Sequence, residues 1–124
     1  MTQYLLSLPH DSAEEPTMES MAREDPAALE ALFEKVGAFN TALLESDALV
    51  AAGGLQPPAT AITVDATGER PRRTAGPFVQ ADQYLGGFWL IQAADQEAAL
   101  AWAEQASAAT GSRIEVRALQ EGPQ

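Results

Sequence analysis

The stretch GGFWLIQA, residues 86–93, decides the fold because it is an extended apolar run without a polar face. In a strand, successive side chains point to opposite sides. Phe88 and Leu90 therefore point one way while Trp89 and Ile91 point the other. Both faces need cover, which is typical of a strand in the middle of a sheet.

Helix signals flank this strand in both directions along the chain. Asp25 followed by Pro26 is a helix start, since a capping carboxylate precedes a proline at the first helical position. Asp95 caps a second helix that ends at Gly111. The first helix runs to about Ser46, and its core-facing stripe is Leu29, Leu32, Phe33, Val36, Phe39 and Leu43.

The remaining strands complete an alternating order. QYLLSL at 3–8 is a second run that is apolar on both faces, LVAAGG at 49–54 ends at paired glycines, and RIEVRAL at 113–119 closes the chain. Residues 62–65 and 70–74 form an extra hairpin that suits a sheet edge. The order predicts an α+β fold, a ferredoxin-like sandwich with an extra β-hairpin, spanning residues 1–124 as a single domain.

Two helices cover only one face of such a sheet. The apolar side chains of the central strands, Leu5, Trp89 and Ile91 or their opposite numbers, then form a patch on the other face. We therefore expect a homodimer packed sheet to sheet.

Composition narrows the function. A net charge of −11 repels phosphate backbones and anionic bilayers, so nucleic acid and membrane are not expected as partners. There are no cysteines and only one histidine, which leaves no thiol nucleophile and no credible metal site, and no cofactor is expected. The N-terminus is interpreted as a first strand rather than a signal peptide, which favours a cytoplasmic location.

The motifs VGAFN, AGGLQPPAT, AGPF, LGGFWLI, AALAWA and GSRIEVRAL, in this order, resemble the YCII-related family, in the branch called DGPF-domain proteins. The resemblance covers nearly the whole chain. It implies a dimeric α+β barrel with a cleft near the dimer interface, in a group whose members mostly lack an assigned activity. Some relatives have been proposed as enzymes that use a His and an Asp in that cleft, and genes of this branch often neighbour those of extracytoplasmic-function sigma factors.

The sequence departs from the family pattern at two positions. Ala75 stands where the branch has the aspartate before Gly-Pro-Phe, and Gln80 stands where an acid is often found. Neither side chain can exchange a proton near neutral pH, so a general base at either position has been lost. Whether the protein is an enzyme is therefore an open question at this stage.

His10 is the candidate acid or base, because an imidazole titrates near neutrality. The alternative, which we favour, is a solvated residue at a strand exit. Arg72 and Arg73, with Arg70 close by, offer forked donors to a small anion, although charge on an edge strand is the simpler explanation. Arg117 belongs, with Arg113 and Glu115, to a charged row on the last strand, which faces either the cleft or its neighbouring strands.

The segment Gly76-Pro77-Phe78 is interpreted as a rigid corner, with Phe78 inserting into the core. Gly86 and Gly87 allow a bulge or a close approach of another chain. Polar tips on aromatic walls are common in ligand pockets. The residues expected to line the cleft are Gln56, Arg72, Arg73, Phe78, Gln80, Tyr84, Trp89 and Arg117.

Three functions compete. The first is a cofactor-free homodimer without robust catalysis that binds a small organic molecule, anionic if the arginines hold it, or another protein, and that assists transcriptional regulation. The second is a cofactor-independent lyase, hydrolase or oxygenase with His10 as the proton carrier. The third is a protein-interaction module, against which a well-walled pocket would count.

Overall fold

The computed structural model describes residues 1–10 and 23–121 of the chain. The strands are β1 (Thr2–His10), β2 (Leu49–Gly54), β3 (Ile62–Asp65), β4 (Arg72–Ala75), β5 (Tyr84–Ala93) and β6 (Glu115–Ala118). The helices are α2 (Pro26–Glu45), α3 (Gln96–Thr110) and a short 3-10 turn at Pro58–Thr60. The α+β class and the predicted order of elements are confirmed.

Four of these strands form one antiparallel sheet in the order β2-β5-β1-β6. The two runs that are apolar on both faces, β1 and β5, lie in the middle, as predicted. Leu6 is paired with Trp89 on one side and with Val116 on the other. The arrangement is consistent with a ferredoxin-like sandwich.

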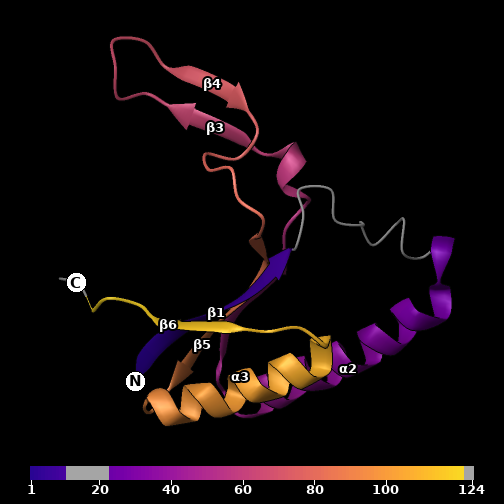
Figure 1. The fold of residues 1–124 in the computed structure, drawn as a ribbon. Coiled ribbons are helices and arrows are strands. Elements are labelled where there is room, and N and C mark those ends of the chain that lie inside the picture. Colours follow the sequence, from indigo (N-terminus) through magenta and orange to yellow (C-terminus); the bar gives the residue numbers. More distant parts are fainter. Residues whose placement is uncertain (11–22, 122–124) are drawn as a thin grey trace.

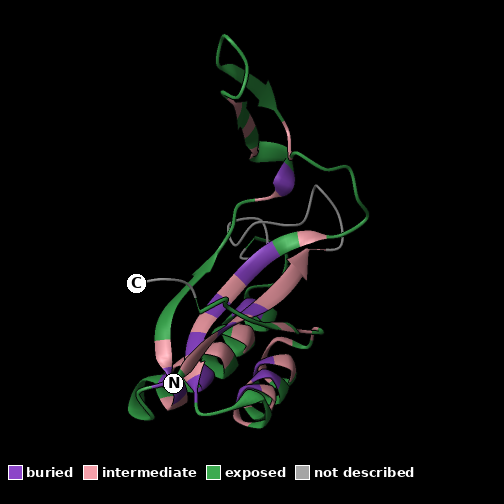
Figure 2. Cartoon of the chain, turned by 90° about the vertical axis from the view of Figure 1, so that its left-hand side faces the viewer, coloured by how far each residue is buried: buried purple, intermediate pink, exposed green. Residues whose placement is uncertain are grey.

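Both helices pack on the same face of the sheet (Figure 1). The side chains between the layers form the core. Figure 2 colours the chain by burial, and the buried residues lie in the central strands and in the helices. Leu6, Leu43 and Ile91 are fully buried there. The core also contains Tyr4, Phe39, Ala48, Trp89, Ala93, Ala99, Ala103 and Ala106. Of the two faces of β5, the Trp89 and Ile91 face is therefore the one the helices cover.

The two helices begin at the capping residues predicted from the sequence, and the second helix ends at the predicted glycine. The Oδ1 of Asp25 accepts from the backbone N–H of Ala28 at 3.1 Å, and the Oδ1 of Asp95 accepts from that of Ala98 at 2.9 Å. Gly111 ends α3 with a left-handed φ of 68°. One member of the predicted stripe was wrong, because Phe33 is 51% exposed.

The extra hairpin is not an edge of the main sheet. β3 and β4 pair only with each other in the part of the chain that the structure describes, with Ile62 opposite Ala75 and Asp65 opposite Arg72. The hairpin stands away from the sheet, on the side opposite the helices (Figure 1). The predicted pairing of the hairpin is confirmed, and its returning strand is an edge strand, in a two-stranded sheet of its own rather than in the main sheet.

Candidate functional site

A hollow lies along the edge of the sheet where β1 runs on past β6. The pairing of β6 with β1 covers Tyr4 to Ser7 only, whereas β1 continues to His10. The register of β1 against β5 also shifts between Leu8 and Pro9. The backbone of β1 beyond Ser7 is thus left without β6 beside it, and the space becomes a depression.

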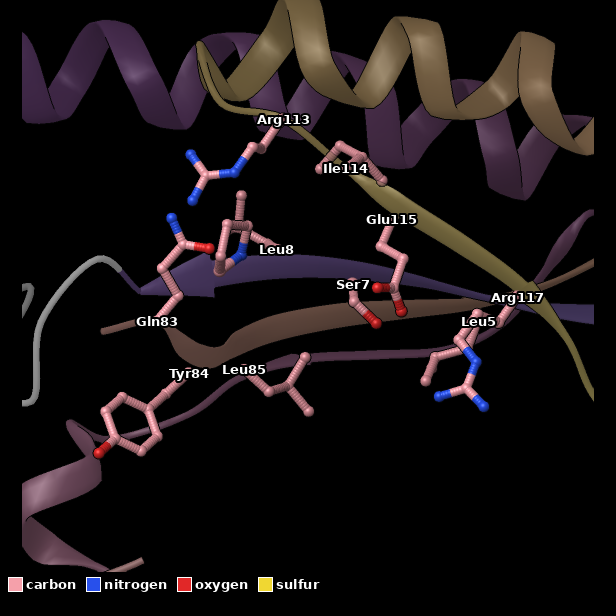
Figure 3. Close-up of a pocket in the computed structure, with 11 residues that line it drawn as sticks. Leu5, Ser7, Leu8, Gln83, Tyr84, Leu85, Arg113, Ile114, Glu115 and Arg117 are labelled. Atoms are coloured by element: carbon pink, nitrogen blue, oxygen red, sulfur yellow. The ribbon is translucent and has the colours of Figure 1, made fainter. Parts of the chain in front are cut away.

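The volume of this hollow is about 550 Å³, within the range of small-molecule sites, roughly 300–1,000 Å³. Its walls combine aliphatic, hydroxyl, amide and charged side chains: Leu5, Ser7, Leu8, Pro9, Gln83, Tyr84, Leu85, Arg113, Ile114, Glu115 and Arg117. Figure 3 shows Leu5, Leu85 and Arg117 among them, on the side of the sheet away from the helices. Five of these side chains are aliphatic and five are polar or charged, so the hollow offers both apolar contact and polar groups to a small molecule.

Charge in the hollow comes from β6 and the residue pair before it. Arg113, Glu115 and Arg117 contribute two guanidinium groups and one carboxylate to its rim. Arg117 lies opposite Leu5 of β1, and Glu115 lies opposite Ser7. An arginine presents a planar fork of donors that matches a carboxylate or phosphate, so this rim suits an anionic ligand better than a cationic one.

The open face of the sheet continues from the hollow as an apolar surface. Leu5 is opposite Leu90, and Phe88 is opposite Gly53, so these side chains share the face that the helices leave bare. The ring of Phe88 lies 3.6 Å from the position that a Cβ on Gly53 would take. Leu85, next to them along β5, is 44% exposed.

His10 ends β1 and packs on the backbone of β5. Its imidazole Cδ2 lies 2.4 Å from the position that a Cβ on Gly86 would occupy, so only glycine leaves room for the ring. Within the described residues, its buried Nδ1 has no hydrogen-bond partner. His10 is opposite Tyr84, which lines the hollow, whereas the imidazole itself is not part of that lining.

The two hairpin arginines lie outside the hollow. Arg72 makes an ion pair with Asp65 across the hairpin at 3.6 Å, and Arg73 is exposed beside Val64. Hydrogen bonds from the Thr67 hydroxyl (2.6 Å) and backbone N–H (3.0 Å) lower the pKa of Asp65 below its usual 3.8, with a smaller contribution from Arg72. These contacts order the turn of the hairpin.

The other expected cleft residues are divided. Tyr84 and Arg117 line the hollow, while Gln56 and Gln80 are exposed elsewhere. Trp89 lies on the opposite face, in the core, where it is 6% exposed. Its indole Nε1–H donates to Oδ1 of Asn40 at 2.7 Å. The aromatic walls expected around the cleft are thus supplied by Tyr84 but not by Trp89.

The turn residues have separate roles. Gly76 has a φ of 108°, a conformation that L side chains rarely adopt, which confirms a special bend before the partly buried Pro77. The insertion of Phe78 into the core was wrong, because its side chain is 88% exposed. A Cβ on Gly87 would lie 3.2 Å from the carbonyl oxygen of Gly53, so the close approach at this glycine is made by a strand of the same chain, and an approach by another chain stays a prediction.

Several pocket residues were not singled out from the sequence, including Ser7, Gln83 and Leu85. Their only sequence signal was their position at the ends of the two central strands. Arg113 and Glu115 were recognised as a charged row with Arg117, and that row does face the hollow. Residues 1–10 and 23–121 contain no group of three acidic or histidine side chains that could hold a metal ion.

None of the helices in the described segments is long and apolar enough to cross a membrane. An antiparallel sheet with both helices on one face and a polar-rimmed hollow on the other defines an α+β protein consistent with the ferredoxin-like arrangement. The YCII-related domain model matches residues 11–121, and the chain belongs to this family. A search of the curated proteins gave no match.

Proposed function

We propose that this YCII-related protein is a homodimer that binds a small organic anion in the hollow between β1 and β6, close to the dimer interface. The observation that carries the proposal is the hollow itself, whose lining combines the guanidinium groups of Arg113 and Arg117 with the aliphatic side chains of Leu5 and Leu85. An aromatic or branched carboxylate fits this chemistry, since its apolar body meets the leucines and its charge meets a guanidinium.

The uncovered face of the sheet supports dimerisation. Leu5, Phe88 and Leu90 are apolar side chains on the face that lacks helices, and all three are partly exposed in the single chain. Contiguous apolar patches of this kind usually mark an interface. A two-fold axis would bring the same face of a second copy against it, and the dimeric α+β barrel implied by the family resemblance is such an assembly.

The ligand proposal is tested by NMR titration with benzoate and its neutral analogue benzamide. We expect benzoate to shift the amide resonances of β1 and β6, and benzamide to bind more weakly. Arg117→Gln should weaken benzoate binding by roughly tenfold, as expected for a charge-assisted contact. Arg23→Gln, at an exposed position outside the hollow, is the matched control. Equal binding of benzoate and benzamide would contradict the proposal.

The dimer proposal has a separate test in light scattering. Leu90→Lys places a charge on the open face, and Ala101→Lys places the same charge on an exposed position of α3. Only the first variant should become monomeric, because only there would an ammonium group be buried in the interface. If both variants keep the mass of the parent protein, the open face is not the interface.

An enzyme using His10 is the second candidate, favoured by the buried Nδ1 that lacks a hydrogen bond among the described residues. A proton carrier needs a ring nitrogen that the substrate can reach, so this candidate requires the imidazole to turn toward the hollow, which it does not line in this conformation. His10→Gln would then abolish turnover of a bound anion while its binding persists. The link to sigma-factor regulation rests on the resemblance alone and stays a prediction.

A further inference from the structure

The hairpin formed by β3 and β4, residues 62–75, is termed the arm. Neither of its strands makes an extensive contact with any other helix or strand that the structure describes. A two-stranded hairpin alone is marginally stable in water, and it needs a third strand or a packing partner to be independently stable. The arm therefore requires a surface to rest on, which residues 1–10 and 23–121 do not supply.

The two faces of the arm differ. On one face, Thr63 donates its hydroxyl to the carbonyl of Gly76 at 2.8 Å, and Asp65 pairs with Arg72, so the polar groups are satisfied within the arm. The opposite face presents Ile62 and Val64, which are 66% and 62% exposed. Their cross-strand neighbours are Ala75 and Arg73. This second face is the one that lacks a partner.

The direction of the arm indicates where its partner lies. Figures 1 and 2 both show it extending from the sheet on the side away from α2 and α3. A second copy packed on the open face would occupy the same side. The arm would then run alongside that copy rather than into solvent.

Charge favours the same occupant. Residues 62–75 carry three arginines against two acids, although the whole chain has a net charge of −11. A cationic arm is attracted to a strongly anionic body, and a second copy of this chain supplies one. Arg73 lies on the apolar face beside Val64, so it would approach the second copy together with the aliphatic side chains.

We infer that the arm packs its Ile62 and Val64 face on a second copy and carries Arg73 to the rim of that copy's hollow, so that each site is completed by the other chain. The inference rests on the proposed dimer. It adds the Arg73 guanidinium to the two arginines that line the hollow in the single chain. It also accounts for the exposed side chain of Phe78, since residues 76–78, which follow the arm, would contact the second copy as well.

The absence of cysteine makes a site-specific test possible. Val64→Cys places one thiol on the apolar face, and Thr74→Cys places one on the opposite face as the matched control. Both positions are exposed within the single chain. The alkylation rate of each thiol by iodoacetamide is measured on samples whose mass is determined by light scattering.

In dimeric samples we expect the thiol at position 64 to react at least roughly tenfold more slowly than the thiol at position 74. The contact that buries position 64 against the second copy must open before iodoacetamide can reach the thiol. The two rates should converge when the protein is diluted to monomer. Equal rates in a sample shown to be dimeric would overturn the arm inference while the dimer stands. A protein that is monomeric at every concentration would overturn both.

Hydrogen exchange on the unsubstituted chain gives an independent readout. The amides of β3 and β4 should exchange slowly in the dimer and rapidly in the monomeric Leu90→Lys variant. Arm amides that exchange at the same rate in both would contradict the inference even if a cysteine variant fails to assemble.

Discussion

The hydrogen bond between Trp89 and Asn40 offers the sharpest test of the core. The indole Nε1–H donates to Oδ1 of Asn40 at 2.7 Å, and the Trp89 side chain is 6% exposed. The indole also meets the ring of Phe39 edge to face, with centroids 5.2 Å apart. Asn40→Leu keeps the size of the side chain at the end of this contact but removes the acceptor.

The expected loss of stability comes from the indole N–H, which is left buried without an acceptor. A buried polar group that loses its partner costs about 1–3 kcal/mol of the free energy of unfolding. For a chain of this length, each kcal/mol corresponds to a change in Tm of about 4 °C. We therefore expect the Tm of Asn40→Leu to fall by roughly 4–12 °C at a fixed protein concentration.

A double-mutant cycle isolates the hydrogen bond from the change in packing. Trp89→Phe removes the donor, so Asn40→Leu should cost much less in that background than in the parent chain. Urea denaturation of the four proteins should give a coupling of about 1–2 kcal/mol. Effects that add to within about 0.3 kcal/mol would refute the reasoning.

Three further outcomes follow from individual residues. Gly86→Ala should displace the imidazole of His10, because the new Cβ would lie 2.4 Å from Cδ2, and the resonances of this single histidine should shift in an NMR spectrum. Gly111→Ala should lower the free energy of unfolding by about 1 kcal/mol, because alanine resists the φ of 68° at this position. Gly37→Ala in α2, where the new methyl group meets no other atom, should raise the free energy of unfolding by about 0.5–1 kcal/mol. Urea denaturation measures both changes. The pKa of Asp65 lies below its usual 3.8, so the contacts by which this carboxylate orders the arm should be fully present above pH 3.8 and be lost as the pH falls through the lowered pKa. The amide chemical shifts of the arm would report this transition, and Asp65→Asn should abolish it.

The element ends could be predicted because local chemistry determines them. Asp25 and Asp95 each satisfy an otherwise unpaired N–H of the first helical turn, and Gly111 adopts a left-handed φ that other residues resist. The central position of β1 and β5 could also be predicted, since only a middle strand buries side chains on both faces.

Which face of β5 meets the helices could not be predicted, because the Phe88 and Trp89 sets are both apolar. The structure shows the decisive polar contact, which is the Asn40 acceptor for the Trp89 indole on the helix side. That the arm lies apart from the main sheet could not be predicted either, since strand patterns specify the pairing within a hairpin but not where the hairpin lies. Phe78 was misplaced for the same reason.

The site was predicted only in part. Arg117 lines the hollow because the alternation predicted for the last strand is correct. Tyr84 was expected there for its aromatic ring with a polar tip, although it precedes the strand predicted at 86–93. The hollow itself arises from the unequal lengths of β1 and β6, and its leucines and Ser7 carry no chemical signature of their own. Spacing along the chain therefore located the charged rim but not the cavity.

The most direct measurement is a native mass spectrum of the full chain, purified without a tag under gentle conditions. The account predicts a species of twice the 13.1 kDa chain mass, with a small increment that is lost on collisional activation and is reduced in Arg117→Gln. A spectrum that contains only the 13.1 kDa monomer, without an increment, would contradict the proposed dimer and its anion site together.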